Sequence, residues 1–210
     1  SLADEPEEIF VPQINNNFSV PELKVKGVIF FSSPCDSDAV ESLKKINTPA
    51  YKIASFDLTD DRLIKEIASI GKPLILSTGM ANLMEIQIAV DKARELGNDD
   101  LILLQCTSLY PAPTHLSNLN AMRTMKSVFK TLVGYSDHTT GEHIALASIS
   151  LGACFLEKHF TLDQNLPGPD HSFGMEPKEF KLMISNIRDI EEGLGDGIKN
   201  GPREEEIEMA

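Results

Sequence analysis

The 210-residue sequence lacks tryptophan, has only three cysteines and contains no long apolar run. No stretch approaches the roughly 20 apolar residues that cross a bilayer, and no basic segment leads into an apolar one at the N-terminus, so neither a membrane span nor a signal peptide is expected. Cys35, Cys106 and Cys154 are odd in number and widely spaced, which favours buried, packed thiols in a reducing compartment over disulfides or a zinc cluster. We therefore expect a cytoplasmic protein.

Positive charge is also scarce, because 19 basic residues stand against 32 acidic ones and the net charge is −13. Nucleic acids and anionic lipids require a positive surface that displaces counterions, so binding to either is not expected. A small anionic substrate is still compatible with this charge, since a local pocket can be positive on an acidic protein. The acidic runs near both ends, at 4–8 and 203–206, are typical of solvated surface or linker.

Short apolar, β-branched runs alternate with helical patterns along the chain, and 41% hydrophobic residues are enough for the core of one domain. The predicted strands are 28–31, 51–54, 74–76, 101–104, 132–135 and 154–160. The predicted helices are 38–45, 61–70, 83–96, 119–129, 143–151 and 177–194. Residues suited to begin or end these helices stand at their boundaries: Asp36, Thr59 or Asp60, Asn82, Pro177, Gly71, Gly97 and Gly152.

Six strand–helix units indicate a parallel sheet with outer helices, either an open doubly wound sheet or a (β/α)8 TIM barrel. Nearly every predicted strand ends in hydroxyl, charged or histidine side chains, and these converge only if the strands close into a ring. No strand is followed by a GxGxxG or Walker loop. We therefore predict an α/β TIM barrel. Because such a barrel usually takes about 250 residues, this one is expected to be incomplete at the N-terminus.

Two histidines, His138 and His159, end consecutive predicted strands and should point into the same mouth. Together with water or substrate oxygens, two imidazoles can hold a divalent metal such as Mn²⁺, Zn²⁺ or Fe²⁺. The alternative is a pair of hydrogen-bonded polar residues at strand ends. Asp137 and Glu157 are nearby carboxylates that could orient a ligand or act as a base, whereas His115 and His143 are expected on the surface.

A second group of strand-end residues surrounds one lysine with hydroxyls. Phosphate and carboxylate need several converging donors and a compensating charge, so this pattern predicts a phosphorylated, acidic small molecule. Any single serine here could instead cap the following helix. Two proline-rich loops place Tyr110 and Asp170 over the same mouth, where a polyhydroxylated substrate would need donors and acceptors. The group consists of Lys52, Ser33, Ser55, Ser77, Ser108 and Ser136.

Five ordered strings resemble the N-acetylneuraminate (sialic acid) synthase family, over a span from about residue 28 to the C-terminus. They are YKIAS at 51–55, GKP at 71–73 continuing to LSTGM at 76–80, CTSLYP at 106–111, SDHT at 136–139 and EKHFT at 157–161, and GPD at 168–170 agrees with them. Their order and spacing make the resemblance specific.

The resemblance implies a transferase that condenses phosphoenolpyruvate with an N-acylated amino sugar such as N-acetylmannosamine. Phosphate would leave by C–O cleavage, and the nine-carbon 2-keto acid product would serve capsule or other cell-surface polysaccharides. The resemblance also implies a divalent ion on His138 and His159 that polarises the sugar aldehyde. We expect Mn²⁺, with Mg²⁺, Co²⁺ or Zn²⁺ as alternatives.

Roles for single residues also follow from the resemblance. Ser33 stands where the family usually has threonine, Glu157 would position the attacking water, and Tyr110 and Asp170 would face the sugar. The implied catalytic residues are Glu157, Lys52 and His138. The positions that match phosphoenolpyruvate-binding residues of the family are Lys52, Ser55, Ser77, Ser108 and Ser136.

The N-terminal part departs from the family pattern. Residues 1–27 show neither of two expected strand–helix units, with their EIGxNH-type motif and a lysine in a KFQ string. The antifreeze-like domain, which in the family reaches into the partner of a dimer, is also missing. We therefore expect a piece of a longer, homodimeric protein, with an unassigned segment 1–27, a barrel 28–195 and an acidic linker 196–210. If the chain were the whole protein, we would expect a synthase with impaired or no activity.

The sugar and the reaction each have alternatives. The string ASF at 54–56 resembles the pseudaminic acid branch, whose substrate is a 2,4-diacetamido-trideoxy sugar, whereas LPGPDH at 166–171 is closer to sialic and legionaminic types. We favour a bacterial nonulosonic acid synthase. A metal-dependent aldolase using free pyruvate is disfavoured by the anion-binding group, and a truncated barrel kept as a binding module is the non-enzymatic alternative.

Overall fold

The computed structural model describes residues 27–209, in which parallel strands alternate with helices. The strands are β1 (Tyr51–Ile53), β2 (Leu74–Ser77), β3 (Leu101–Cys106), β4 (Leu132–Asp137) and β5 (Leu156–Lys158). The α-helices are α2 (Ser37–Lys45), α3 (Asp61–Ala68), α4 (Leu83–Glu95), α5 (Ala121–Phe129), α6 (His143–Ser150) and α7 (Pro177–Leu194). The short 3₁₀ turns are η1 (Ser55–Asp57), η2 (Thr114–Leu116), η3 (His171–Phe173) and η4 (Glu204–Met209).

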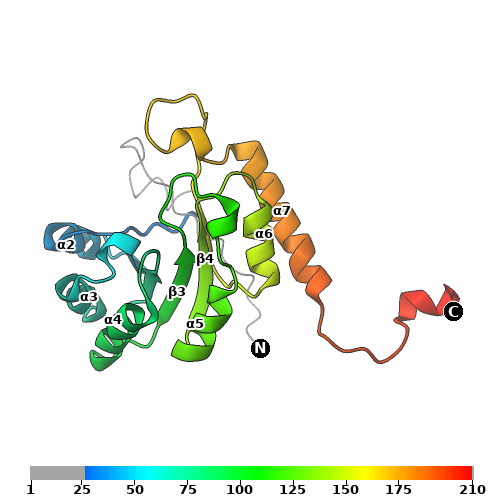
Figure 1. Cartoon of the computed structure of the whole chain (residues 1–210), viewed down its shortest axis with the longest axis horizontal. Coiled ribbons are helices and arrows are strands. Elements are labelled where there is room, and N and C mark those ends of the chain that lie inside the picture. Colours follow the sequence, from blue (N-terminus) through cyan, green and yellow to red (C-terminus); the bar gives the residue numbers. More distant parts are fainter. Residues whose placement is uncertain (1–26, 210) are drawn as a thin grey trace.

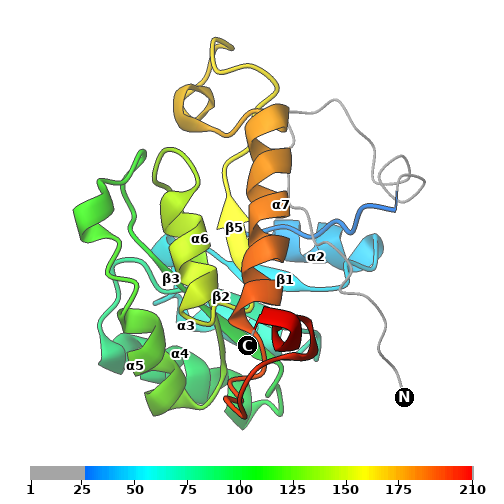
Figure 2. The ribbon, with the colours of Figure 1, turned by 90° about the vertical axis from the view of Figure 1, so that its right-hand side faces the viewer.

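The sheet follows chain order, β1-β2-β3-β4-β5, and every neighbouring pair is parallel. The sheet is curled and the helices lie around its outside (Figure 1), so the predicted incomplete (β/α)8 barrel is confirmed, with five strands among the described residues. Figure 2 shows α6 and α7 side by side, and their apolar faces share a small core cluster that includes Ala145, Met183 and Ile187.

The strands alternate between an outer and an inner face. Leu74 and Leu76 belong to the large core under the helices, whereas Ile75 packs inside with Phe31 and Leu104. The alternation follows from the two-residue period of a strand. Gly134 of β4 has a packing reason, because a Cβ there would lie only 2.3 Å from the carbonyl oxygen of Phe155. A side chain at this position would push β5 away.

The helix ends lie within two residues of the predicted ones, and local signals mark several of them. Asp36 caps α2, and Asp60 rather than Thr59 caps α3 by accepting from two backbone N–H groups. Asn82 and Glu85 form a reciprocal capping box on α4. A cap of this kind contributes about 1 kcal/mol. The glycines that end helices, Gly71, Gly97 and Gly152, all have positive φ.

The predicted strand 28–31 is wrong. Among residues 28–32 only Ser32 forms a bridge, with Tyr51, and the N–H of Lys52 donates to its carbonyl. Thr48 Oγ1 instead donates to the carbonyl of Phe30.

The expectation of buried cysteines holds only for Cys106, because Cys35 and Cys154 are exposed. Within the described residues no helix is long and apolar enough to cross a membrane. The segment 1–27 lies outside the described residues except for Gly27, and the proposed domain division stays a prediction.

Candidate active site

The carboxyl ends of β1, β4 and β5 are joined by a chain of polar side chains on the inner face. Lys52 Nζ lies 3.3 Å from Glu157 Oε1, and the Ser136 hydroxyl donates to the same oxygen at 2.7 Å. His138 Nε2 lies 3.2 Å from Ser136 Oγ. The β4–β5 register places Ser136 opposite Glu157, so the two side chains share a face. Four predicted site residues therefore form one continuous chain of contacts.

His138 has a defined tautomer. Its Nδ1 lies 2.7 Å from the carbonyl oxygen of Thr107, and because a carbonyl only accepts, Nδ1 carries the hydrogen. Burial lowers the pKa of His138, which favours the neutral ring with a lone pair on Nε2. Ser136 has one hydroxyl hydrogen for two acceptors, Glu157 Oε1 at 2.7 Å and His138 Nε2 at 3.2 Å, and the shorter contact is the one to Glu157. The Nε2 atom is thus left able to bind a cation or a substrate hydrogen.

His159 stands beside His138, with ring centroids 5.4 Å apart and planes at 76°. Burial and then the neighbouring His138 lower the pKa of His159. Two imidazoles bound to one metal have centroids roughly 4.5 to 5.2 Å apart, given metal–nitrogen distances near 2.1 Å. At 5.4 Å the observed pair lies just outside this range, so the rings would move slightly closer to share one ion. Among the described residues no group of three or more His, Cys, Asp or Glu converges on a metal position, so water or substrate would supply the other ligands.

Aromatic rings and one carboxylate surround the two histidines. Tyr110, 44% exposed, lies with its ring 4.3 Å from that of His138, and Phe173 lies 5.0 Å from His159. Burial raises the pKa of Tyr110, so its phenol stays protonated and able to donate. Asp170 Oδ2 lies 3.7 Å from His159 Nδ1. The loop between β5 and α7, which stands above the sheet in Figure 2, brings Asp170 and Phe173 to this place.

A second cluster lies at the ends of β2 and β3. Ser55 Oγ lies 3.1 Å from Cys106 Sγ, and the same sulfur accepts from the N–H of Gly79 at 3.2 Å. A Cβ on Gly79 would lie 2.5 Å from both Ser55 Oγ and Ser108 Oγ, so these hydroxyls converge on the bare glycine. Burial raises the pKa of Cys106, which keeps it a neutral thiol. The sequence reasoning missed Gly79 and Cys106, although both lie within the family strings quoted above.

Two hydroxyls of the predicted anion-binding group have no partner. Ser77 Oγ and Ser108 Oγ are buried, and no described protein atom forms a hydrogen bond with either. Leaving a buried polar atom unpaired costs about 1–3 kcal/mol. Groups of this kind are typical of positions where a ligand or an ordered water completes the hydrogen bonding.

Two further candidates lie elsewhere. Ser33 is exposed in the segment before α2, and no described contact joins it to the other site residues. Asp137 was a candidate to orient a ligand, but it lies on the outer face of β4, paired with Lys158 at 2.8 Å. Asp137 faces outward because side chains alternate along a strand, and its neighbours Ser136 and His138 point inward. His115 and His143 are exposed, as expected.

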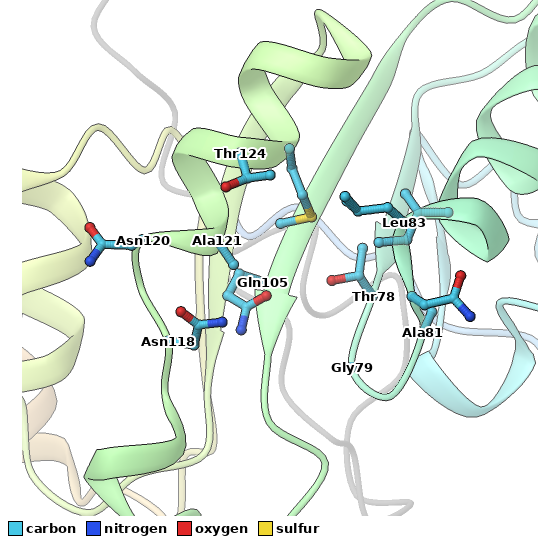
Figure 3. Close-up of a pocket in the computed structure, with 12 residues that line it drawn as sticks. Thr78, Gly79, Ala81, Leu83, Gln105, Asn118, Asn120, Ala121 and Thr124 are labelled. Atoms are coloured by element: carbon cyan, nitrogen blue, oxygen red, sulfur yellow. The ribbon is translucent and has the colours of Figure 1, made fainter.

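A hollow of about 400 Å³ lies between the starts of α4 and α5 (Figure 3). Gln105 and Thr78 face it, and both already donate to backbone carbonyls, of Ser117 and Leu104 respectively. None of the predicted site residues lines it. Lys52, the two histidines and the unpartnered hydroxyls lie instead on the inner face of the sheet, at or near the strand ends. We therefore place the candidate active site there.

Known proteins resemble this chain in sequence. An N,N'-diacetyllegionaminic acid synthase from Campylobacter jejuni is 46% identical over 181 residues, which cover 85% of this chain and 54% of the relative. A pseudaminic acid synthase from the same species is 40% identical over 172 residues, which cover 82% of this chain and 50% of the relative. The chain therefore spans about half the length of these curated relatives.

Solved structures agree with this likeness. A sialic acid synthetase from Leptospira borgpetersenii, determined in complex with citrate, has a TM-score of 0.82 and 36% identity, over 89% of this chain and 65% of that one. A truncated 3-deoxy-D-arabino-heptulosonate 7-phosphate synthase from Thermotoga maritima, at 16% identity and a TM-score of 0.73, shares the fold alone. The model of the NeuB family matches residues 20–199. Since this match includes most of the chain, the chain belongs to the NeuB family.

Proposed function

We propose that this chain forms the phosphoenolpyruvate-binding part of a nonulosonic acid synthase, which condenses phosphoenolpyruvate with an N-acylated amino sugar and releases phosphate. The observation that carries the proposal is the pair of buried, unpartnered hydroxyls, Ser77 and Ser108, at the ends of β2 and β3, in the same sheet as Lys52 of β1. Hydroxyl donors and one lysine form the donor set that an acidic phosphorylated molecule requires. The relatives named as legionaminic and pseudaminic acid synthases support the reaction class.

The residues divide into three roles. Lys52 and the serine hydroxyls would bind the phosphate and carboxylate of phosphoenolpyruvate and orient its C3 toward the sugar aldehyde. After C3 attacks, water adds to C2 and the C2–O bond to phosphate breaks. Glu157, which contacts Lys52 and Ser136, would accept a proton from that water.

The two neutral histidines would hold a divalent ion, and we propose Mn²⁺. When bound, the ion polarises the sugar aldehyde as a Lewis acid. The Nδ1–H bond of His138 to Thr107 would prepare it for this role, because it leaves Nε2 without a hydrogen of its own. Tyr110 and Asp170 would contact the sugar from above. We also propose a cytoplasmic homodimer, in keeping with a biosynthetic role.

The sugar is proposed at the level of its class, because legionaminic and pseudaminic acid synthases match this chain at 46% and 40% identity. A 2,4-diacetamido-trideoxy sugar is therefore an alternative to N-acetylmannosamine. A steady-state comparison of these sugars at fixed phosphoenolpyruvate decides between them, because only the correct sugar supports rapid phosphate release.

The reaction class is tested by inorganic phosphate release from the purified protein with Mn²⁺. Release that requires both phosphoenolpyruvate and the amino sugar supports the synthase. Consumption of free pyruvate with no phosphate release would identify an aldolase. If the protein binds phosphoenolpyruvate but catalyses neither reaction, the barrel is a binding module.

Binding alone is tested by calorimetry with phosphoenolpyruvate. Lys52→Met removes the cation of the site and should weaken binding about tenfold to a hundredfold, because a hydrogen bond to a charged group contributes about 1.5–3 kcal/mol. The matched control is Lys45→Met on the exposed surface of α2, which should leave binding unchanged. Equal affinity in the two variants would refute the proposed role of Lys52.

A further inference from the structure

An ion pair lies on the outer side of the strand ends that carry the histidines. Lys158 Nζ is 2.8 Å from Asp137 Oδ2, and the two side chains are 3% and 0% exposed. Both residues point away from the candidate site, and the proposed reaction uses neither. The β4–β5 register pairs Asp137 directly with Lys158.

The ion pair also binds the backbone of Thr139, the residue that follows His138. Lys158 Nζ also donates to the carbonyl oxygen of Thr139 at 2.6 Å. Asp137 Oδ1 accepts from the N–H of Thr139 at 2.9 Å. The residues before and after His138 are therefore tied to each other and to the lysine that immediately precedes His159.

These bonds link the residues next to His138 with the residue next to His159 across the β4–β5 pair. His138 follows Asp137, His159 follows Lys158, and a change in the Asp137–Lys158 distance would shift both imidazoles relative to each other. Two further bonds hold His138 from the other side, because Ala112 N–H donates to its carbonyl and its Nδ1–H donates to Thr107. Thr107 and Ala112 belong to the segment after β3, whereas Lys158 reaches this part of β4 from β5, as Glu157 does at Ser136.

Stability alone is a weak reason for this pair. Replacing a buried ion pair by neutral residues of similar volume is often neutral or stabilising, because removing two charges from water is costly. The three directed hydrogen bonds of Lys158 and Asp137 supply geometry instead. We propose that Lys158, acting through Asp137 and Thr139, is a positioning residue that sets the separation and orientation of His138 and His159.

The inference rests on the proposed metal-binding role of the two histidines. Residues that orient metal ligands typically change metal affinity 10–100-fold when they are mutated. We therefore expect loss of Lys158 to weaken Mn²⁺ binding in that range, although the amine itself never contacts the ion.

The test separates positioning from stability. Lys158→Met alone would leave the Asp137 carboxylate buried and unpaired, so the informative variant is the double substitution Asp137→Asn/Lys158→Met, which removes both charges and keeps an acceptor for Thr139. Mn²⁺ affinity is measured by electron paramagnetic resonance, and the imidazole nitrogens of the metal-free protein by ¹⁵N NMR. The control is Asp61→Asn/Lys92→Met, which removes an ion pair of the same 2.8 Å length between α3 and α4, more exposed than the Asp137–Lys158 pair, together with the contact of Asp61 to Lys65.

The expected result is a double variant with a near-parental unfolding midpoint, Mn²⁺ affinity reduced 10–100-fold, and shifted His138 and His159 nitrogen signals, against an unchanged control. A folded double variant with parental Mn²⁺ affinity and parental imidazole signals would overturn the inference. If the parent protein binds no Mn²⁺, the proposed metal role fails, and the imidazole signals of the metal-free variants still decide whether Lys158 positions the rings.

Discussion

Replacement of Gly79 by alanine should disrupt phosphoenolpyruvate binding out of proportion to its effect on folding. Gly79 has a φ of +25° and donates its N–H to Cys106. An alanine Cβ would lie 2.5 Å from Ser55 Oγ, from Ser55 Cβ and from Ser108 Oγ. Because real Cβ atoms do not approach other heavy atoms so closely, both serines must move.

The magnitude has two parts. Positive φ costs a non-glycine residue about 1–2 kcal/mol, and overpacking adds about 1–3 kcal/mol, so Gly79→Ala should lower the unfolding free energy by roughly 2–5 kcal/mol. Displacing the two hydroxyls should also cost hydrogen bonds to the anion. At about 1.5–3 kcal/mol for a bond to a charged group, phosphoenolpyruvate affinity should fall at least about tenfold.

Gly97→Ala is the matched control for backbone strain. Its φ is +79°, and a Cβ there would meet no atom within 4 Å. Urea unfolding and calorimetric titration with phosphoenolpyruvate are measured on both variants. The control should lose only about 1–2 kcal/mol of stability and keep its affinity. If Gly79→Ala matches the control in both measurements, the convergence of Ser55 and Ser108 on Gly79 does not form the binding site.

The unpartnered hydroxyl of Ser77 predicts opposite effects on folding and on binding: Ser77→Ala should keep or raise the unfolding free energy, by up to about 1 kcal/mol, while phosphoenolpyruvate affinity falls about tenfold. A loss of stability with unchanged affinity would contradict this. The lowered pKa values of His138 and His159 predict that the metal-free protein loses stability as the pH falls below about 6.5, because the unfolded chain then binds more protons than the folded one. Urea unfolding at pH 7.5 and 5.5 measures the effect, and His138→Gln should reduce the slope; an unchanged slope would show that His138 is not buried as a neutral ring.

The sequence predicted the strand–helix units closely because their signals are local. The helix predicted at 177–194 is observed with those limits, since Pro177 suits the first turn and its apolar residues repeat with helical period. The strand predicted at 28–31 is wrong because a strand exists only with a hydrogen-bonded partner. Here the bridge to β1 is limited to Ser32 and Tyr51, and the Thr48 hydroxyl donates to the carbonyl of Phe30. A partner on another segment is not visible in the run of residues itself.

The features of the candidate site likewise divide into those that the local sequence predicts and those that depend on tertiary contacts. The sequence by itself determined which residue types end the strands: Lys52, the serines and the two histidines stand in strings that also carry the family resemblance. Only the tertiary structure decided that Asp137 faces outward to Lys158 while Glu157 faces inward to Lys52, and that Thr107 holds the hydrogen of His138 on Nδ1. Residue type and short periodicity can be recognised from neighbouring positions in the sequence. The sheet face that a side chain occupies, the tautomer of a histidine and the partner of a hydrogen bond depend instead on strand register and on contacts between segments distant in the chain.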